Sequence, residues 1–226
     1  MNNNILEIKK INKNFRHRNG LIQIFKNVTL NIKKGELVAL VGPSGSGKST
    51  LLNIISLIDV PTSGQIIFNN KDIGNLNEEK KDNIRKKNIS MIFQDNNLLA
   101  DFTALENVFL PLIIRGEKIK FSQKKAEKIL DSFNLKSRQN HYPDELSGGE
   151  QQRVAIARVL VSETDLILAD EPTGNLDHKT SQEIFSYFLK LKKLKKTIIF
   201  ATHNRDLANK ADYKLSILNG NIKRVN

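Results

Sequence analysis

Residues 42–49 read GPSGSGKS and fit the pattern G-x-x-x-x-G-K-[ST]. An apolar strand pattern precedes them at Glu36–Val41, and a helical pattern follows at Ser49–Ile58. Glycines let backbone N–H groups curl around phosphate oxygens, and the positive end of the following helix points at the same anion. This context argues against a chance glycine turn. The residues predicted to bind nucleotide phosphates are Gly42, Pro43, Ser44, Gly45, Ser46, Gly47, Lys48, Ser49 and Thr50.

Specific roles follow from the chemistry of such a loop. We expect Lys48 to bridge the β- and γ-phosphates and Ser49 to ligate Mg²⁺. Two carboxylates, Asp170 and Glu171, end the apolar stretch Leu166–Ala169. There, Asp170 is expected to hold Mg²⁺ or its waters, and Glu171 to polarise an attacking water. The alternative is that two acids simply begin a loop, but a phosphate loop in the same chain favours the functional interpretation.

A third motif, Ser147-Gly148-Gly149-Glu150, lies between the first two. It predicts a capping box, with Ser147 as N-cap and Glu150 at the third position of a helix over Gln151–Leu160. A cap explains the serine and the glutamate but needs no pair of glycines, which lower helix propensity. Glycines at a helix N-terminus do allow a phosphate to approach closely. We therefore expect Ser147 and the amides of Gly148 and Gly149 to face an anion as well.

Composition limits the class of protein. The chain has 226 residues, 39% of them hydrophobic, and no cysteine, which indicates a globular domain without disulfides. No apolar run approaches the ~18 residues of a membrane span, and the N-terminus shows no secretory signal. The net charge of +12 fits nucleic-acid binding, an anionic membrane surface, or a drift in composition toward lysine and asparagine. Aromatic residues are few and scattered, so we expect no nucleic-acid partner.

The order of patterns along the chain predicts an α/β core with an inserted helical lobe. Alternation at Ile5–Ile11 and Leu21–Ile32 indicates an antiparallel sheet, and short strands are expected at 65–68 and 89–93. Residues 103–114 and 122–133 have helical periodicity, with Ser122 as a candidate N-cap, and no strand pattern returns before residue 165. We expect a single domain whose core comprises residues 1–94 and 151–226, with the lobe at 95–150. The C-terminal part should contain a strand at 166–169, a helix at 179–195, a strand at 197–201 and a hairpin turning at Asn219-Gly220.

With these motifs, Gln94 and His203, the whole chain resembles the ATP-binding subunits of ABC transporters. The resemblance implies a RecA-like P-loop NTPase core with an antiparallel β subdomain. It also implies that two copies close head to tail around two ATP·Mg²⁺, so that the Ser147 segment of each copy completes the other's site. By the same resemblance, Gln94 contacts Mg²⁺ or the attacking water and reports to a membrane partner, and His203 contacts the γ-phosphate.

Three further positions carry open alternatives. Phe15 occupies the place of the aromatic residue that stacks on adenine in the family, but a phenylalanine near a first strand can equally belong to the core. Asn175-Leu176-Asp177 matches the family's D-loop at the subunit interface, while Asp177 can also be an N-cap. The family pattern Thr-His-Asp appears here as Thr202-His203-Asn204, which leaves the role of the third position open.

Residues 170–177, which read DEPTGNLD, resemble one branch of the family, containing lipoprotein-release, cell-division and macrolide-export ATPases. Residues 97–108 and 110–112 are closer to the lipoprotein-releasing members. This implies an ATPase on the cytoplasmic face of an inner membrane that works on separate spanning subunits. The cell-division relative is the nearest alternative. ABC ATPases that act on DNA or ribosomes usually carry coiled-coil insertions, zinc cysteines or tandem halves, which are absent from this sequence.

The segment at residues 97–108 bears on the choice of partner, because it follows Gln94 directly. Leu98, Leu99 and Phe102 surround Asp101 and form a candidate apolar docking patch for a spanning subunit. The alternative is that these side chains fold into the lobe's own core.

Overall fold

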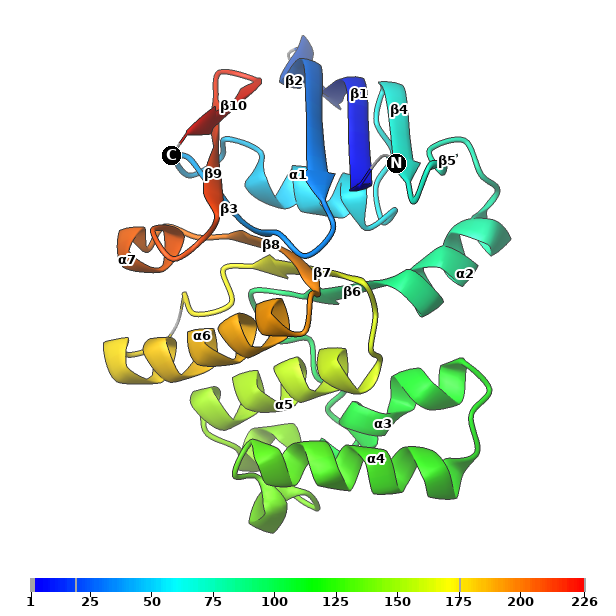
Figure 1. Ribbon diagram of the computed structural model, residues 1–226, viewed down its shortest axis with the longest axis vertical. Coiled ribbons are helices and arrows are strands. Elements are labelled where there is room, and N and C mark those ends of the chain that lie inside the picture. Colours follow the sequence, from blue (N-terminus) through cyan, green and yellow to red (C-terminus); the bar gives the residue numbers. More distant parts are fainter. Residues whose placement is uncertain (1–2, 19, 175, 226) are drawn as a thin grey trace.

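The computed structural model describes residues 3–18, 20–174 and 176–225, which form two sheets with helices around them (Figure 1). One sheet is antiparallel, in the order β2-β1-β4-β5, with β1 at Asn4–His17, β2 at Gly20–Lys33, β4 at Ser63–Phe68 and β5 at Lys71–Asp72. The other has six strands among the described residues, in the order β10-β9-β3-β8-β7-β6. Its strands are β3 (Leu37–Val41), β6 (Ile89–Ile92), β7 (Leu166–Asp170), β8 (Thr197–Ala201), β9 (Tyr213–Leu218) and β10 (Asn221–Val225).

The six-stranded sheet has the pairing expected of a P-loop NTPase core. β6, β7, β8, β3 and β9 run parallel, and only β10 is antiparallel to its neighbour. The carboxyl ends of the parallel strands therefore meet at one edge, where ligands bind in open α/β sheets. The predicted fold class, a RecA-like core with an antiparallel β subdomain, is confirmed.

Strand β3 separates two hydrophobic cores because its side chains alternate between faces. Val38 and Leu40 pack with the antiparallel sheet and with α1 (Lys48–Ile55). Leu37 and Ala39 point the other way, toward α5 (Gly148–Val161) and α6 (His178–Lys193). The phosphate loop joins β3 to α1 and is thus fixed at both ends by elements buried in these cores.

Two further helices and two short turns lie at the end of the molecule away from the antiparallel sheet (Figure 1). They are α3 (Ala104–Ile114) and α4 (Ile119–Ser132), followed by the short 3₁₀ turns η1 (Lys136–Arg138) and η2 (Pro143–Glu145). α3 and α4 pack against each other and against α5, which also contacts β6 and α6. The predicted boundary between lobe and core, at residue 150, lies in the first turn of α5. Because α5 is continuous across this point, the division into lobe and core stays a prediction.

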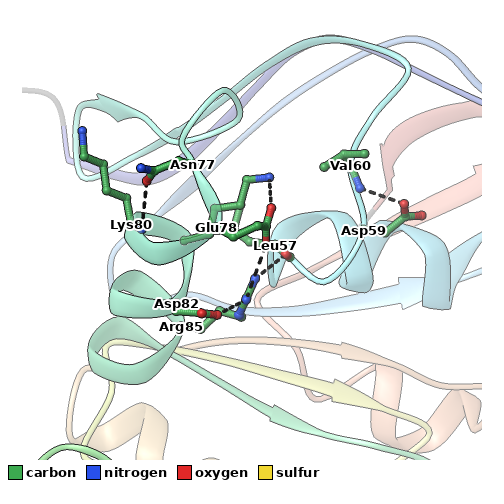
Figure 2. Close-up of polar contacts among 9 residues, drawn as sticks. Leu57, Asp59, Val60, Asn77, Glu78, Lys80, Asp82 and Arg85 are labelled. Atoms are coloured by element: carbon green, nitrogen blue, oxygen red, sulfur yellow. Dashed lines mark hydrogen bonds and ion pairs between the residues drawn. The ribbon is translucent and has the colours of Figure 1, made fainter.

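One helix, α2 (Glu78–Asn88), has no counterpart in the sequence-based prediction. Its sequence, EEKKDNIRKKN, offers no apolar stripe, so periodicity does not reveal it. Both ends of α2 do carry sequence signals. Asn77 is the N-cap and accepts a hydrogen bond from the Lys80 backbone N–H at 3.1 Å, and the first turn contains acidic residues while the last contains basic ones. Figure 2 shows how it is held, with Arg85 donating to the Leu57 carbonyl just beyond α1, at 2.6 Å.

Of two further local predictions, the helix cap at Ser122 is wrong and the C-terminal hairpin turn is confirmed. Ser122 is not an N-cap: α4 already begins at Ile119, and the buried Ser122 hydroxyl donates to the Lys118 carbonyl oxygen at 3.1 Å inside the helix. The apolar periodicity does not reveal this earlier start because the first residues, Ile119–Phe121, are exposed. The hairpin turn is confirmed, since Asn219 and Gly220 both have positive φ, as a type I′ turn requires. Among the described residues, no helix combines the length and apolar character needed to cross a bilayer.

Candidate functional site

The phosphate loop adopts backbone angles that its glycines alone allow easily. Gly45 and Gly47 have φ of 75° and 101°, in the left-handed region. A Cβ at Gly47 would lie 2.7 Å from Cγ2 of Ile24 and 2.9 Å from Cζ of Phe25, so the loop is pressed directly onto β2. Gly47 then serves as the N-cap of α1, which directs the positive end of that helix toward the pocket.

Lys48 is the buried cation of the loop, with 7% of its surface exposed. Its Nζ donates to the carbonyl oxygens of Gly42 and Pro43, at 3.1 and 3.2 Å, and lies 3.2 Å from Nε2 of His203. All three partners can be neutral acceptors. A buried ammonium surrounded by neutral acceptors strongly favours an anion as its next neighbour.

The two predicted carboxylates lie beside this lysine. Asp170 is the last residue of β7 and is buried, while Glu171 has φ of 45°, which is costly for a residue with a side chain. The Glu171 N–H donates to the Ala201 carbonyl oxygen at 3.1 Å, which holds this conformation. Its carboxylate accepts from the His203 backbone N–H at 3.3 Å and lies 3.3 Å from Nε2 of the same residue. His203 Nε2 thus lies between an ammonium and a carboxylate.

Together these residues line a cavity of about 220 Å³ at the carboxyl edge of the parallel sheet. The residues that line it are Ile24, Ser44, Gly45, Gly47, Lys48, Ser49, Thr50, Gln94, Asp170, Glu171 and His203. Gly42, Pro43 and Ser46 shape the loop instead of lining this cavity. The Ser46 N–H donates to the Pro43 carbonyl oxygen at 3.2 Å, and its buried Oγ has no hydrogen-bond partner among the described residues. The structure therefore brings together most of the residues predicted from the phosphate loop, Gln94, the acidic pair and His203.

The donor set of this cavity fits a hard divalent cation bound together with phosphate. Ser49, Gln94 and Asp170 supply a hydroxyl, an amide and a carboxylate, all oxygen donors of the kind Mg²⁺ prefers. In the described part of the chain, no three His, Cys, Asp or Glu side chains form a metal-binding group. Mg²⁺ usually takes one or two protein ligands plus phosphate oxygens and waters, so this donor set suits a metal that arrives with a nucleotide.

The Ser147 segment has the capping box that its sequence predicts. Ser147 Oγ accepts from the Glu150 N–H at 3.3 Å, and a Glu150 carboxylate oxygen accepts from the Ser147 N–H at 2.8 Å. Burial disfavours ionisation of Glu150, but hydrogen bonds from Ser147 and from Arg138, at 2.9 Å, outweigh this and lower its pKa. A Cβ at Gly148 would meet nothing within 4 Å, so this helix end faces open space.

The Ser147 segment does not line the phosphate cavity of its own chain. Gly148 borders an adjoining cavity of about 260 Å³, which shares Gln94 and Glu171 with the phosphate cavity. Ser147 and Gly149 line neither cavity. Any contact between Ser147 and a phosphate in the cavity of Lys48 therefore has to come from another copy or from a movement of α5.

Two other predicted binding residues also lie outside the phosphate cavity. Phe15 is 42% exposed on β1, opposite Ile22 of β2, with Nζ of Lys13 4.5 Å from its ring centroid. It is therefore not a core residue. Asp177 is the N-cap of α6 and accepts from the Thr180 N–H at 3.0 Å and from its hydroxyl, and these bonds from Thr180 lower its pKa. Asn175, the first residue of the matched D-loop, lies outside the described residues.

The structure gives Asn204 a role that the sequence left open. Its side-chain oxygen accepts from the backbone N–H groups of Asp206 and Leu207, at 2.9 and 3.1 Å, and so caps α7 (Arg205–Ala208). Aspartate and asparagine are about equally good N-caps. The departure from the family's Thr-His-Asp pattern therefore preserves the turn that follows His203.

Two residues that organise the site have no role predicted from the sequence. Arg158 of α5 donates to the carbonyl oxygens of Asn96 and Asn97, both at 2.7 Å, and thus holds the loop that follows Gln94. Burial lowers the pKa of this guanidinium. Asn107 of α3 is fully buried and bonds to the backbone of Leu99, Phe102 and Thr103. For Asn107, the available signal is a polar side chain beside Glu106 in an otherwise apolar helical run.

The predicted docking patch divides in two. Leu98 is partly buried and packs against the hydrophobic core, so it does not belong to an open surface. Leu99 and Phe102 are 42% and 37% exposed. The bonds from Asn107 hold this loop so that those two side chains remain outside.

Comparisons with known proteins agree with this geometry. A family model described as ABC transporter matches residues 25–174. The lipoprotein-releasing system ATP-binding protein LolD of Rickettsia bellii (strain RML369-C) is 48% identical over 219 residues, covering 95% of this chain and 96% of that protein. The protein of the same name from Legionella pneumophila (strain Lens) is 41% identical and covers 98% of both chains.

Solved structures show the same fold. The dimeric ATP-binding cassette MJ0796, bound to ADP and phosphate in a post-hydrolysis state, has a TM-score of 0.92 and 39% identity, covering 97% of each chain. The cbiO1 protein from Clostridium perfringens, part of an ABC transporter complex, has a TM-score of 0.86 at 29% identity and covers all of this chain and 89% of that one. On the family model, the near-complete relatives and these shared structures, the chain belongs to the ABC transporter family of ATP-binding proteins.

Proposed function

We propose that this chain is the ATP-hydrolysing subunit of an ABC transporter that releases lipoproteins from the inner membrane toward the outer membrane. The observation that supports hydrolysis is the grouping of Lys48, Glu171 and His203, with Nε2 of His203 3.2 Å from the lysine and 3.3 Å from the carboxylate. The cargo is inferred from relatives that are named as lipoprotein-releasing proteins and match this chain over nearly their full length.

The chemistry assigned to the site follows from the positions of its side chains. The loop amides and Lys48 hold the phosphates, and the lysine neutralises charge that builds up on the transferred group. Glu171 accepts a proton from the attacking water, because its carboxylate borders the cavity beside the lysine. His203 contributes a hydrogen bond to the γ-phosphate and keeps the Glu171 carboxylate in place. Mg²⁺, when held by Ser49, Gln94 and Asp170, would supply further neutralisation of phosphate charge.

The complete site requires a second copy of the chain. Ser147 and the amides of Gly148 and Gly149 form a helix start, with open space beside Gly148. We assign them to the nucleotide of the opposite copy in a head-to-tail homodimer, with Asp177 near the same interface and Phe15 against the adenine. ATP would join the two copies and hydrolysis would separate them, which is a ligand-dependent two-state switch.

The force is passed to integral-membrane subunits of the LolC and LolE kind, on the cytoplasmic face of the inner membrane. A groove of about 350 Å³ between α2, α3 and α5 offers a place for such a subunit. Phe93 and Asn97, which flank Gln94 closely in sequence, line it together with Ile114 and Arg158. Because Arg158 also holds the loop after Gln94, a segment seated in this groove would sense the state of the phosphate cavity.

The test is purification of the tagged chain from mild detergent extracts of membranes, followed by identification of the spanning subunits that accompany it. The proposal expects subunits that, reconstituted with this chain in lipid, release a lipoprotein to a soluble acceptor when ATP is added. The Glu171→Gln variant should assemble equally well but release nothing. Co-purification with a cell-division membrane subunit, without lipoprotein release, would assign the chain to that alternative. ATP hydrolysis by a chain that co-purifies with neither kind of membrane subunit would refute the proposed cargo and leave the ATPase assignment intact.

A further inference from the structure

An exposed apolar cluster lies at the turn between α3 and α4, outside the phosphate cavity. Ile114 ends α3, while Ile119 and Phe121 lie in the first turn of α4, and their exposed fractions are 57%, 63% and 60%. No other large apolar side chains of α4 are exposed to this degree among the described residues. Three large apolar side chains exposed within eight residues of one turn, rather than scattered over the surface, indicate a contact surface.

Lysines follow the cluster along α4 in an arrangement that the helix itself does not favour, and Lys120 and Lys124 border the same hollow as Phe121. Lys120, Lys124 and Lys128 are exposed and spaced four residues apart, so they form one row along α4. Like charges at this spacing repel each other. Lys118 and Lys120 also lie at the positive end of the helix dipole, and the first turn contains no acid. A negative surface opposite the row would relieve both costs.

The local acids leave this corner positive. Between residues 115 and 128 the chain has six Lys or Arg and two Glu, a difference of four positive charges. Of these cations, Lys125 pairs with Glu163 at 2.9 Å, and Arg115 donates to backbone carbonyl oxygens of Lys86 and Ser162. The lysine row is flanked by Glu127, which accepts from Gln123 at 3.3 Å, and by Asp131 at the far end of the helix.

The position of the cluster relates it to the groove described above. Ile114 and Arg115 line that groove together with Lys86 of α2, so the turn between α3 and α4 forms its rim. In Figure 1, α2 and this turn lie along the same side of the molecule. A membrane subunit seated in the groove would bring the rim close to the bilayer from which that subunit emerges.

We propose that the corner formed by Ile114, Ile119, Phe121 and the row Lys120, Lys124 and Lys128 binds directly to the surface of an anionic lipid bilayer. The apolar side chains enter the boundary between headgroups and acyl chains, and the lysines lie over the acidic headgroups with their stems along the apolar surface. This contact steadies the ATPase beneath its membrane subunits. Its physiological meaning rests on the proposed transporter function, but the lipid contact itself requires no partner protein.

The test uses the purified full-length chain without membrane subunits, sedimented with phosphatidylcholine vesicles that either contain or lack phosphatidylglycerol. Binding is expected only with phosphatidylglycerol and should weaken between about 0.1 and 0.5 M salt. Replacement of Lys120, Lys124 and Lys128 by Gln should weaken it roughly tenfold to a hundredfold. The Ile119→Ser/Phe121→Ser variant should weaken it by at least about tenfold, and its residual binding should depend on salt.

The matched control removes the same number of positive charges elsewhere on the surface. It replaces three exposed lysines by Gln: Lys193, Lys195 and Lys223. It should keep vesicle binding near the wild-type level. All variants should retain basal ATPase activity and their unfolding temperature, which excludes misfolding as the cause. Equal losses in the control and in the α4 variant would reveal non-specific attraction and overturn the proposal. Absence of vesicle binding by the wild type would also overturn the proposal. If the α4 variants in that case failed to co-purify with the spanning subunits from membranes, the corner would be a protein contact.

Discussion

The phosphate loop and the Ser147 segment are both glycine-containing helix starts, yet they are built in opposite ways. The loop around Gly47 presses on β2, and its lysine is buried among carbonyl oxygens and His203. The Ser147 segment satisfies its own backbone with a capping box and leaves Gly148 beside open space. The phosphate loop lines a cavity within its own chain. The Ser147 segment forms a finished helix cap but lines no part of that cavity. The difference supports the proposal that catalysis depends on a second copy.

Glu171→Gln probes the first region and should have the largest effect. Loss of the carboxylate removes the group that polarises water, so hydrolysis should slow by about 10²-fold or more. The ligands for nucleotide and Mg²⁺ remain, so ATP should still bind and should now hold two copies together. Turnover measurements and light scattering with ATP check both parts. Hydrolysis at the wild-type rate would remove Glu171 from its assigned role.

Lys48→Ala probes the same region at the binding step. The lysine is buried and directed into the cavity, so its loss should weaken ATP affinity by about tenfold to a hundredfold. Calorimetric titration of ATP measures this, with Ser147→Arg as the matched comparison. The Ser147 variant should bind ATP nearly as tightly as the wild type while it is monomeric. If both variants lost affinity equally, the contrast between the two regions would fail.

Arg158→Ala probes the connection between the regions, because this side chain joins the helix of the Ser147 segment to the loop after Gln94. We expect nucleotide affinity to be nearly unchanged and hydrolysis to fall by about tenfold, since the loop loses two charge-assisted hydrogen bonds. Arg115→Ala is the control, because Arg115 also binds two carbonyl oxygens but contacts neither Asn96 nor Asn97. Separate measurement of kcat and KM distinguishes this role from general destabilisation. Equal effects of both substitutions on kcat would refute it.

The cap at Ser147 should respond to acid. Because the folded-state pKa of Glu150 lies below its ordinary value, its contribution to stability is full above that ordinary value, about 4.3, and is lost as the pH falls through the lowered pKa. Glu150→Gln should remove this pH dependence and cost about 1 kcal/mol near neutral pH, a shift of about 2–4 °C in Tm. Thermal unfolding at a series of pH values measures both. An unchanged acid limb in the variant would place the titration elsewhere.

The sequence was most informative where a motif fixes backbone geometry. The phosphate loop joins a strand to a helix, the acidic pair lies at the end of a strand, and Ser147 forms its capping box, all as predicted, because glycine freedom and cap chemistry are local properties. It was least informative where tertiary contacts determine which segments become helices and where those helices begin. α2 has no apolar stripe and is held through contacts such as that from Arg85 to Leu57. The predicted cap at Ser122 is wrong because the exposed Ile119 and Phe121 hide the true helix start. No local pattern reveals that Arg158 reaches the loop after Gln94.

If each catalytic site combines Lys48 of one copy with Ser147 of the other, a mixture of two inactive variants should recover activity. Lys48→Ala and Ser147→Arg, carrying different tags, are combined with ATP and the tagged heterodimer is isolated. We expect each variant alone to be nearly inactive, and the heterodimer to regain hydrolysis at the one site where an intact Lys48 faces an intact Ser147. A heterodimer that forms but hydrolyses ATP no faster than either variant alone would contradict the shared site.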